Sequence, residues 1–450
     1  MTVNPAPLAV ADNPSLTEGE RRIVDEIASR RDELVALAGD LIGFDTTARE
    51  RDDDPPRDEA ALQKYLAARL RAAGAETDLW EPAPEDVAGS PMTRPGLRFD
   101  GRPQLAARFP GAGGGRSLLF NGHIDVVTVE PRDRWTSDPF RAEVRAGNLY
   151  GRGSCDMKGG IASMVFAAEV LASLGPRLAG DLIVCTVTDE ESTGAGALAA
   201  VAHGVRADAG IVTESTDFEV KIACLGSLIP TITVPGRPGH AGCPQPHWRE
   251  GGAVNAIDKA SLVSDAMRRL ETDWRQRTDE HHPYLSPGEI VPVQISGGEW
   301  IVSYPASCRL VYHIAYLPGQ ADAAGWGGRV RDEVADWVMR AAGADPWLAE
   351  NPPTIEWAPE VPAAAVAPDE PIVPIMLAAT AAAGRPGRAW GMDGWHDGAT
   401  FTLDGTPSIA FGPGNGSKLA HMVDEYTPVE DLIAAAQALA LAAIRFCGAA

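Results

Sequence analysis

Short apolar runs alternate with longer segments of helical spacing along the first half of the chain. The runs predict buried strands, and apolar residues that recur three and four positions apart predict helices. Such alternation indicates an α/β fold with a mixed, mostly parallel sheet that helices cover on both faces. Segments rich in Pro, Asp and Gly, such as residues 82–103, predict loops. The expected helices are residues 20–43, 58–74, 159–175 and 196–204, and the expected strands are 105–109, 117–127, 181–188 and 209–215.

Near residue 227 the pattern changes to strand, helix, two strands, helix and strand. That order is the ferredoxin-like α+β pattern. We therefore expect a small domain, 227–359, inserted into a larger α/β domain formed by 1–226 and 360–450, with 1–18 as a loose leader. The later elements are strands 228–236, 291–300, 307–318 and 354–358 with helices 252–273 and 326–342, and then helix 372–383, strand 408–412 and helix 429–446.

Length and composition narrow the function classes. A chain of 450 residues is too long for one ordinary core, which favours two domains. The formal net charge of −23 argues against a nucleic-acid partner and an anionic membrane surface. No apolar run reaches the roughly 18 residues of a transmembrane helix, and the first residues do not resemble a secretory signal. Because the six scattered cysteines are typical of buried free thiols, we expect a cytoplasmic protein.

Oxygen and nitrogen donors follow one buried-looking strand after another. The ends of neighbouring strands in an α/β sheet meet at one edge, where such donors can form a metal site. A neutral imidazole and several carboxylates in this arrangement favour a two-metal hydrolase. The donors are His123, Asp125, Asp156, Glu190, Glu191, Glu214 and His421.

Several of these positions have two interpretations. Asp125 is either a ligand or a carboxylate that holds the other ring nitrogen of His123. Asp156, before a helix, is either an N-cap or a bridge between two cations. The acidic triplet that contains Glu190 and Glu191 could be a solvated loop, but an apolar strand leads into it and a Gly-rich turn leads out. Glu190 as general base beside Glu191 as ligand fits that position.

The motifs resemble one family of enzymes. These are GHIDVV, RWTSDPF, YGRGSCDMKGG, TDEESTGAG, VTES, GHAGCPQ with NAID, and FGPG with AHMVDEY. In order and spacing they are similar to the acetylornithine deacetylase, succinyl-diaminopimelate desuccinylase and carboxypeptidase G family of di-zinc metallopeptidases and amidohydrolases. The resemblance covers nearly the whole chain from about residue 25. It implies a zinc-peptidase-like fold with an inserted lid and dimerisation domain, and therefore a homodimer.

The resemblance also implies a metal centre with two Zn²⁺ ions. His123 and Glu214 would bind one zinc, Glu191 and His421 would bind the other, and Asp156 would bridge them. Co²⁺ or Mn²⁺ is also compatible, because a carboxylate-rich site does not select zinc by ligand type alone.

Further roles follow from the same resemblance. Asp125 would orient His123, and Glu190 would activate a metal-bridging water and then protonate the leaving amine. His240 would stabilise the tetrahedral oxyanion in the partner subunit's site, and Asn255 would support that histidine or the substrate. The Asp156–Met157 peptide is expected to be cis.

Two positions depart from the family pattern. Many relatives have an arginine in the inserted domain that grips a substrate carboxylate with two hydrogen bonds. Here its place falls on His313 or Ala315. A second arginine, near the C-terminus, is replaced by Ala399 in a segment where His396 stands for a threonine. Either other basic residues compensate, or the substrate is not an ordinary N-acyl amino acid.

The expected activity is hydrolysis of an amide bond of a small molecule, as by an acetylornithine deacetylase-like N-deacylase. The alternatives are a dipeptidase or carboxypeptidase, and a deformylase of a neutral heterocyclic amide whose pocket Trp390, Trp395 and His396 would line. A non-catalytic binding relative is the remaining alternative. It is disfavoured because Glu190 and all five expected ligands are present.

Overall fold

The computed structural model describes residues 15–49 and 57–450. Two compact units are present. The smaller comprises Cys224–Ala364 and Asp393–Trp395, and the larger contains the described residues up to Ala223 together with Ala365–Met392 and His396–Ala450. Most of the expected leader lies outside the described residues.

The larger unit is built on a mixed sheet of nine strands. Its central strands β6, β3, β7 and β16 run parallel to one another, and the pairs β1–β2, β2–β6 and β16–β8 are antiparallel. This arrangement confirms the predicted fold class. The order is β1 (Glu76–Trp80), β2 (Gln104–Phe109), β6 (Leu182–Val187), β3 (Leu118–His123), β7 (Ala209–Val212), β16 (Ser408–Ala410), β8 (Glu219–Cys224) and β14 (Ala364–Ala365), and β15 (Arg388–Met392) pairs with β8.

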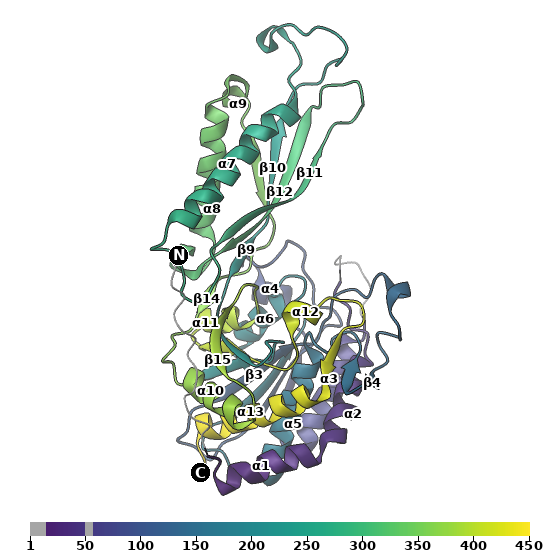
Figure 1. Cartoon of the computed structure of the whole chain (residues 1–450), viewed down its shortest axis with the longest axis vertical. Coiled ribbons are helices and arrows are strands. Elements are labelled where there is room, and N and C mark those ends of the chain that lie inside the picture. Colours follow the sequence, from purple (N-terminus) through teal and green to yellow (C-terminus); the bar gives the residue numbers. More distant parts are fainter. Residues whose placement is uncertain (1–14, 50–56) are drawn as a thin grey trace. The chain divides into compact units, whose positions relative to one another are not determined.

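Helices cover both faces of this sheet (Figure 1). Leu119 on β3 packs in one apolar cluster with Val201 of α6 (Ala195–His203) and Phe401 of α11 (Gly398–Leu403). Gly122 faces the other way, because a Cβ atom there would lie 2.9 Å from the Ile161 side chain of α5. On that face α5 (Lys158–Leu174) packs against α13 (Val429–Cys447), α1 (Glu18–Ser29) and α2 (Arg31–Ile42).

Two local differences from the expected elements have physical causes. The single helix expected over 20–43 is two helices, because Arg30 leaves helical geometry between α1 and α2. The expected loop 82–103 contains the short helix α4 (Pro84–Val87), which begins at a proline, a residue suited to the first helical position. Within the described ranges no helix is long and apolar enough to cross a lipid bilayer. The remaining elements are α3 (Glu59–Ala72), α10 (Ile372–Ala382), α12 (Gly416–Leu419), and a small sheet of β17 (Tyr426–Pro428), β5 (Asn148–Tyr150) and β4 (Glu143–Arg145).

The smaller unit has the predicted ferredoxin-like order. Its antiparallel sheet has the order β11-β12-β10-β13, with β9 paired to β12. Leu270, Ile314 and Val334 belong to the apolar core between this sheet and its helices. The elements are β9 (Gly226–Leu228), β10 (Pro230–Pro235), α7 (Ala256–Gln276), β11 (Glu289–Gly297), β12 (Ser307–Tyr316), α8 (Gly328–Gly343), α9 (Pro346–Glu350) and β13 (Thr354–Trp357) (Figure 1).

Candidate metal and catalytic site

The donors of the larger unit meet at the carboxyl edge of its parallel strands. His123 is the last residue of β3, and Glu190 and Glu214 follow its parallel neighbours β6 and β7. Asp156 precedes α5, and His421 follows α12 with a left-handed φ of 63°. Glu191 completes the group.

Asp156 lies between two histidine–glutamate pairs. Its Oδ1 is 3.2 Å from His123 Nε2 and its Oδ2 is 3.4 Å from His421 Nε2. His123 Nε2 is 3.6 Å from Glu214 Oε1, and His421 Nε2 is 3.2 Å from Glu191 Oε2. One donor atom each of His123, Asp156 and Glu191 falls within 4.8 Å of the others. Both carboxylate oxygens of Asp156 thus face a ring nitrogen.

Burial and crowding perturb the acids and bases of this group. Burial raises the pKa of Glu190 and of Glu214 well above its usual range, and neighbouring carboxylates add to the effect. Burial opposes ionisation of Asp156, but its hydrogen bonds to His123 and His421 hold its pKa below the ordinary value. Hydrogen bonds to Asp156 and Glu191 raise the pKa of His421 to about 10.

This donor set fits divalent cations. Crowded carboxylates repel one another, and a bound cation offsets that repulsion. Glu191 Oε1 is buried and has no hydrogen-bond partner among the described residues, so it is available as a ligand atom. Imidazole nitrogens with carboxylate oxygens suit Zn²⁺, and they also accept Co²⁺ or Mn²⁺.

Asp125 supports the site differently from the expected way. The ring nitrogen Nδ1 of His123 donates to the backbone carbonyl of Asp125 at 2.9 Å, whereas the carboxylate lies 3.7 Å away. Because a carbonyl only accepts, Nδ1 carries the proton and Nε2 is free to bind a metal. The two carboxylate oxygens accept the backbone N–H groups of Glu190 and Glu191 at 3.3 and 3.1 Å. Asp125 therefore connects the histidine to the glutamate turn.

The motif residues around Asp156 include a clamp that the sequence did not reveal. Glu425 Oε1 accepts the backbone N–H groups of Cys155 and Asp156 at 2.7 and 3.0 Å. Arg152 Nη1 donates to the other oxygen of Glu425 at 2.5 Å. The Asp156–Met157 peptide is cis, which confirms that prediction. Arg152 and Glu425 stand in the motifs YGRGSCD and VDEY, but their pairing depends on the fold.

His396 is a buried residue just before the start of α11. It is 2% exposed, and its Nδ1 accepts the backbone N–H of Gly398 at the start of α11 at 3.1 Å. Burial lowers the pKa of its imidazole to about 4, so the ring is neutral. Ala399 is also buried, at 1% exposure. Both residues belong to the packing of α11.

The remaining predicted site residues lie in the smaller unit. His240 is exposed and its Nδ1 accepts the N–H of Gly242, which leaves Nε2 as a donor. Asn255 caps α7, because its side chain accepts the N–H of Ile257 at 3.0 Å. His313 is exposed on β12, and its Nε2 lies 3.0 Å from the hydroxyl of Ser227.

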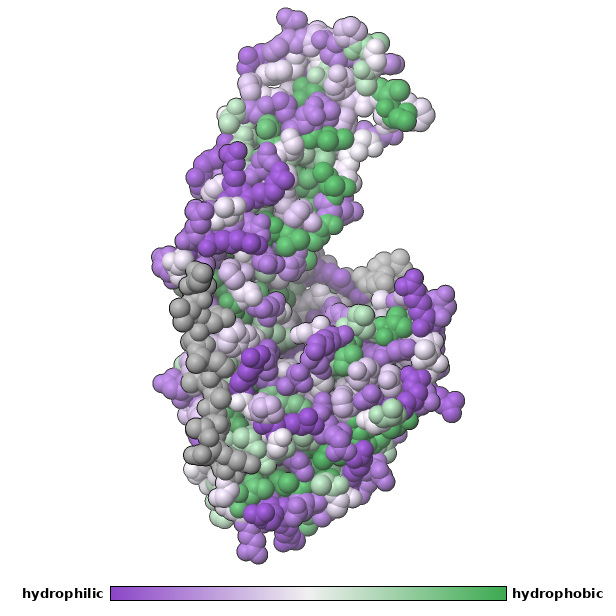
Figure 2. Space-filling model, in the orientation of Figure 1, coloured by the Kyte–Doolittle hydropathy of each residue, from purple (hydrophilic) through white to green (hydrophobic). Residues whose placement is uncertain are grey.

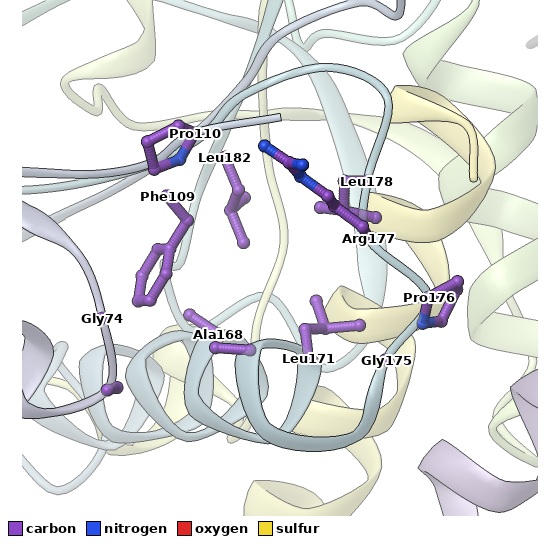
Figure 3. A pocket seen from close by; sticks show the side chains of 12 residues that line it. Gly74, Phe109, Pro110, Ala168, Leu171, Gly175, Pro176, Arg177, Leu178 and Leu182 are labelled. Carbon is purple, nitrogen blue, oxygen red and sulfur yellow. The ribbon is translucent and has the colours of Figure 1, made fainter. Parts of the chain in front are cut away.

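A separate hollow lies at the other end of the strands. This cavity of about 350 Å³ includes Leu182, the first residue of β6, whereas Glu190 and Glu191 follow the last residue of that strand. Phe109, Leu171 and Leu182 point into it, and Arg177 lies at its side (Figure 3). Its lining has no carboxylate, imidazole or thiol, so it is not a second metal site.

Known proteins are similar to this chain in sequence and in fold. Residues 119–445 match the model described as "Peptidase family M20/M25/M40". The chain belongs to this family. It is 28% identical over 429 residues to N-formyl-4-amino-5-aminomethyl-2-methylpyrimidine deformylase of Bacillus subtilis (strain 168), with 91% of this chain and 93% of that protein covered. It is 32% identical over 390 residues to succinyl-diaminopimelate desuccinylase of Methylocella silvestris, with 84% and 91% covered.

Solved structures share the fold of this M20/M25/M40 chain. Aminopeptidase PepT from Bacillus cereus superposes with a TM-score of 0.67 at 19% identity, over 93% of this chain and 98% of that one. The Bacillus subtilis YXEP protein, described as a dinuclear metal binding peptidase, gives a TM-score of 0.61 at 15% identity, over 93% and 99%. Membership confirms the resemblance and the prediction of a metal-dependent enzyme that hydrolyses amide bonds.

Proposed function

We propose that this enzyme cleaves the amide bond of a small molecule with Glu190 as the proton carrier. The arrangement of Asp156 between two histidine–glutamate pairs supports the proposal, because it suits two cations, one with His123 and Glu214 and one with Glu191 and His421. The cations, Zn²⁺ by ligand type with Co²⁺ or Mn²⁺ as alternatives, would polarise the amide carbonyl and lower the pKa of water.

Glu190 is the proposed general base. Its Oε2 lies 4.0 Å from His123 Nε2, and its backbone N–H is fixed by Asp125. A buried carboxylate with a raised pKa can accept a proton from the attacking water and return it to the leaving amine. His240, whose Nε2 is free to donate, is the proposed partner of the oxyanion.

Replacement of Glu190 tests this assignment. Glu190→Gln should retain two metal ions per chain and lose about 10²- to 10⁴-fold in kcat, because the proton carrier is gone while the proposed ligands remain. Metal content by mass spectrometry and steady-state kinetics measure the two effects. A variant that keeps wild-type turnover would contradict the role of Glu190.

For the substrate, one observation favours deformylation of a neutral heterocyclic amide over the N-deacylation of amino acids. Ala399, at the place of an expected arginine, is buried in α11 and offers no fork for a carboxylate. The deformylase of Bacillus subtilis matches this chain over 91% of its length and acts, by its name, on such an N-formyl compound.

A panel of substrates decides between the two. It contains an N-formyl-aminomethylpyrimidine, N-acetylornithine, N-succinyl-diaminopimelate and a dipeptide. We expect the highest kcat/KM for the formamide. A higher value for either carboxylate-bearing amide would favour the deacylase alternative, and a higher value for the dipeptide would favour peptidase action.

We also propose a homodimer formed along strand β11. This strand is at the edge of its sheet, and Val291, Val293 and Ile295 on it are 41%, 56% and 66% exposed. Figure 2 shows such hydrophobic residues among hydrophilic ones on the surface of the smaller unit. An exposed apolar edge strand readily pairs with another strand. Sedimentation should show a dimer, and Val293→Lys should shift it to monomer; a wild-type monomer would contradict the proposal.

The cysteines support a reducing compartment, which we propose is the cytoplasm. None of the six, all of which lie in the described part of the chain, forms a disulfide, and five of them are buried. Alkylation of the denatured protein without reductant, directly after cell lysis, should modify all six; a blocked pair would contradict the proposal.

A further inference from the structure

A buried arginine connects three segments beneath the glutamate turn. Arg102, 2% exposed, precedes β2 and donates in three directions. Its Nε donates to Glu59 Oε1 at 2.8 Å, its Nη1 to Asp189 Oδ1 at 2.7 Å, and its Nη2 to Thr188 Oγ1 at 2.8 Å. Glu59 is the first residue of α3, and Thr188 and Asp189 follow β6. We call these four residues the Arg102 network.

Asp189 is the residue directly before Glu190, and its backbone starts the turn. Its φ of 72° is left-handed, a region that side chains other than glycine rarely adopt. Its carbonyl accepts the N–H groups of Thr193 and Gly194 at 3.0 and 2.7 Å, and its Oδ2 accepts the Thr193 hydroxyl. The turn is thus held through the side chain of Asp189 and, at the following two residues, by the carboxylate of Asp125.

Charge within the network is balanced by its surroundings. Burial alone would lower the pKa of Arg102, but the carboxylates of Asp189 and Glu59 outweigh it and raise that pKa. Arg49, 7% exposed, lies 3.9 Å from Glu59 Oε2 and adds a second positive charge. Buried ion pairs are often replaceable by apolar groups without loss of stability, so stability alone gives little reason for four buried charges. The geometry of the adjacent turn, which carries Glu190 and Glu191, gives a better reason for these buried charges.

We propose that Arg102 is a positioning residue that sets the orientation of Glu190 and Glu191 through Asp189. The planar guanidinium fixes the carboxylate of Asp189 on one side while Glu59 and Thr188 fix the guanidinium on the other. The backbone of Asp189 then presents one glutamate to the attacking water and the next to a cation. This inference rests on the proposed function, which supplies the roles of the two glutamates.

The test combines kinetics, metal affinity and a double-mutant cycle. Arg102→Met should lower kcat about 10- to 100-fold with KM within about twofold of the wild-type value, because supporting residues of metal sites have effects of this size. The dissociation constant for Zn²⁺, from competition with a chelator, should rise about 10- to 100-fold. Arg102→Lys keeps the positive charge but lacks the planar, multiply donating guanidinium. Its kcat and its dissociation constant for Zn²⁺ should lie between those of wild type and Arg102→Met.

The cycle tests the route through Asp189. If Arg102 acts through this carboxylate, Asp189→Asn should also lower kcat. The kcat of the double variant, Arg102→Met with Asp189→Asn, should then be no lower than that of the more severe single variant. Arg69→Met is the matched control, since Arg69 stands on α3 like Glu59 and pairs with the partly buried Glu169 away from the site. It should lower thermal stability and leave kcat and zinc affinity unchanged.

Three results would overturn the proposal: unchanged kcat and zinc affinity in folded Arg102→Met, additive effects in the cycle, or an equal loss in Arg69→Met. If Arg102→Met does not fold, two other variants replace it: Arg102→Lys, and Thr188→Val, which removes one acceptor of the guanidinium. Their readouts and the results that would contradict the proposal are the same.

Failure of this proposal can be distinguished from failure of the proposed function. A wild-type enzyme that is inactive on every amide would refute the activity, and the zinc titration would still decide whether Arg102 orients Glu191.

Discussion

At the scale of single residues, His396 shows how burial sets the protonation state of an imidazole. The ring is enclosed and accepts the N–H of Gly398. An acceptor at Nδ1 together with full burial favours the neutral ring. The histidine therefore makes the folded state sensitive to acid.

The pH dependence has a definite sign. Burial lowers the pKa of His396 from 6.5 to about 4, so between these values the unfolded chain binds a proton that the folded chain does not. The contribution of the neutral His396 to the free energy of unfolding is therefore fully present above pH 6.5 and decreases as the pH falls toward 4. At about 1.4 kcal/mol per pKa unit, this shift in the pKa of His396 lowers the free energy of unfolding by roughly 3 kcal/mol at low pH.

His396→Gln should therefore lower the midpoint pH of acid unfolding, because glutamine can accept the same N–H without a protonation penalty. Circular dichroism between pH 7 and 3 measures it. His203→Gln, at a partly exposed histidine paired with Asp78, is the control and should leave the midpoint unchanged. A midpoint in His396→Gln equal to that of wild type would contradict the assignment.

The same scale shows what sequence could and could not predict at the site. The proposed metal ligands follow strand ends and short motifs, so each could be proposed from its own neighbourhood in the sequence. The supporting pairs were not, because Glu425 reaches the backbone of Asp156 across 269 positions and Arg102 reaches Asp189 across 87. Arg102 stands in a segment rich in Pro, Asp and Gly that resembles any exposed loop. Only the fold brings it to the turn.

At the scale of elements, helix α5 depends on how closely it approaches the sheet. Thirteen of the seventeen residues of α5 are buried, on all sides of the helix, so the apolar pattern predicts a helix without indicating which side faces the strands. Gly160 marks the contact: a Cβ atom there would lie 1.9 Å from the carbonyl oxygen of Thr213, just beyond β7. Glycine permits this approach because it has no side chain.

Gly160→Ala should force α5 away from β7 and destabilise the larger unit by about 1–3 kcal/mol, the usual effect of overpacking. Because Asp156 and Glu214 lie at the ends of these two elements, zinc affinity should fall as well. Gly39→Ala is the matched control on α2, since its Cβ atom would meet the Ala142 methyl at an ordinary 3.5 Å. The melting temperature of Gly160→Ala should be lower than that of wild type, and that of Gly39→Ala should equal or exceed it. Equal melting temperatures of Gly160→Ala and wild type would contradict the packing argument.

At the scale of the whole molecule, the order of elements was predictable because alternation and the ferredoxin-like pattern are properties of continuous segments. Contacts between distant segments were not. Asp393–Trp395 follows strand β15 in the chain but clusters with the smaller unit. The carboxylate of Asp393 accepts the N–H and hydroxyl of Ser286 at 2.9 Å, and the N–H of Leu225 donates to Gly394. No periodicity in the sequence encodes these contacts.

The proposed metal centre joins five distant segments of the larger unit, so cation binding should stabilise that unit as a whole. A ligand that binds only the folded state stabilises it by about 2.7 kcal/mol when its free concentration is 100 times its dissociation constant. Chelation should therefore lower the melting temperature, and added Zn²⁺ should restore it in proportion to the logarithm of free zinc. Glu190→Gln should keep this response and His421→Ala should weaken it, because only the second removes a proposed ligand. Calorimetry of chelated and zinc-loaded protein measures the shift, and equal melting temperatures in the two states would refute a metal centre built on these residues.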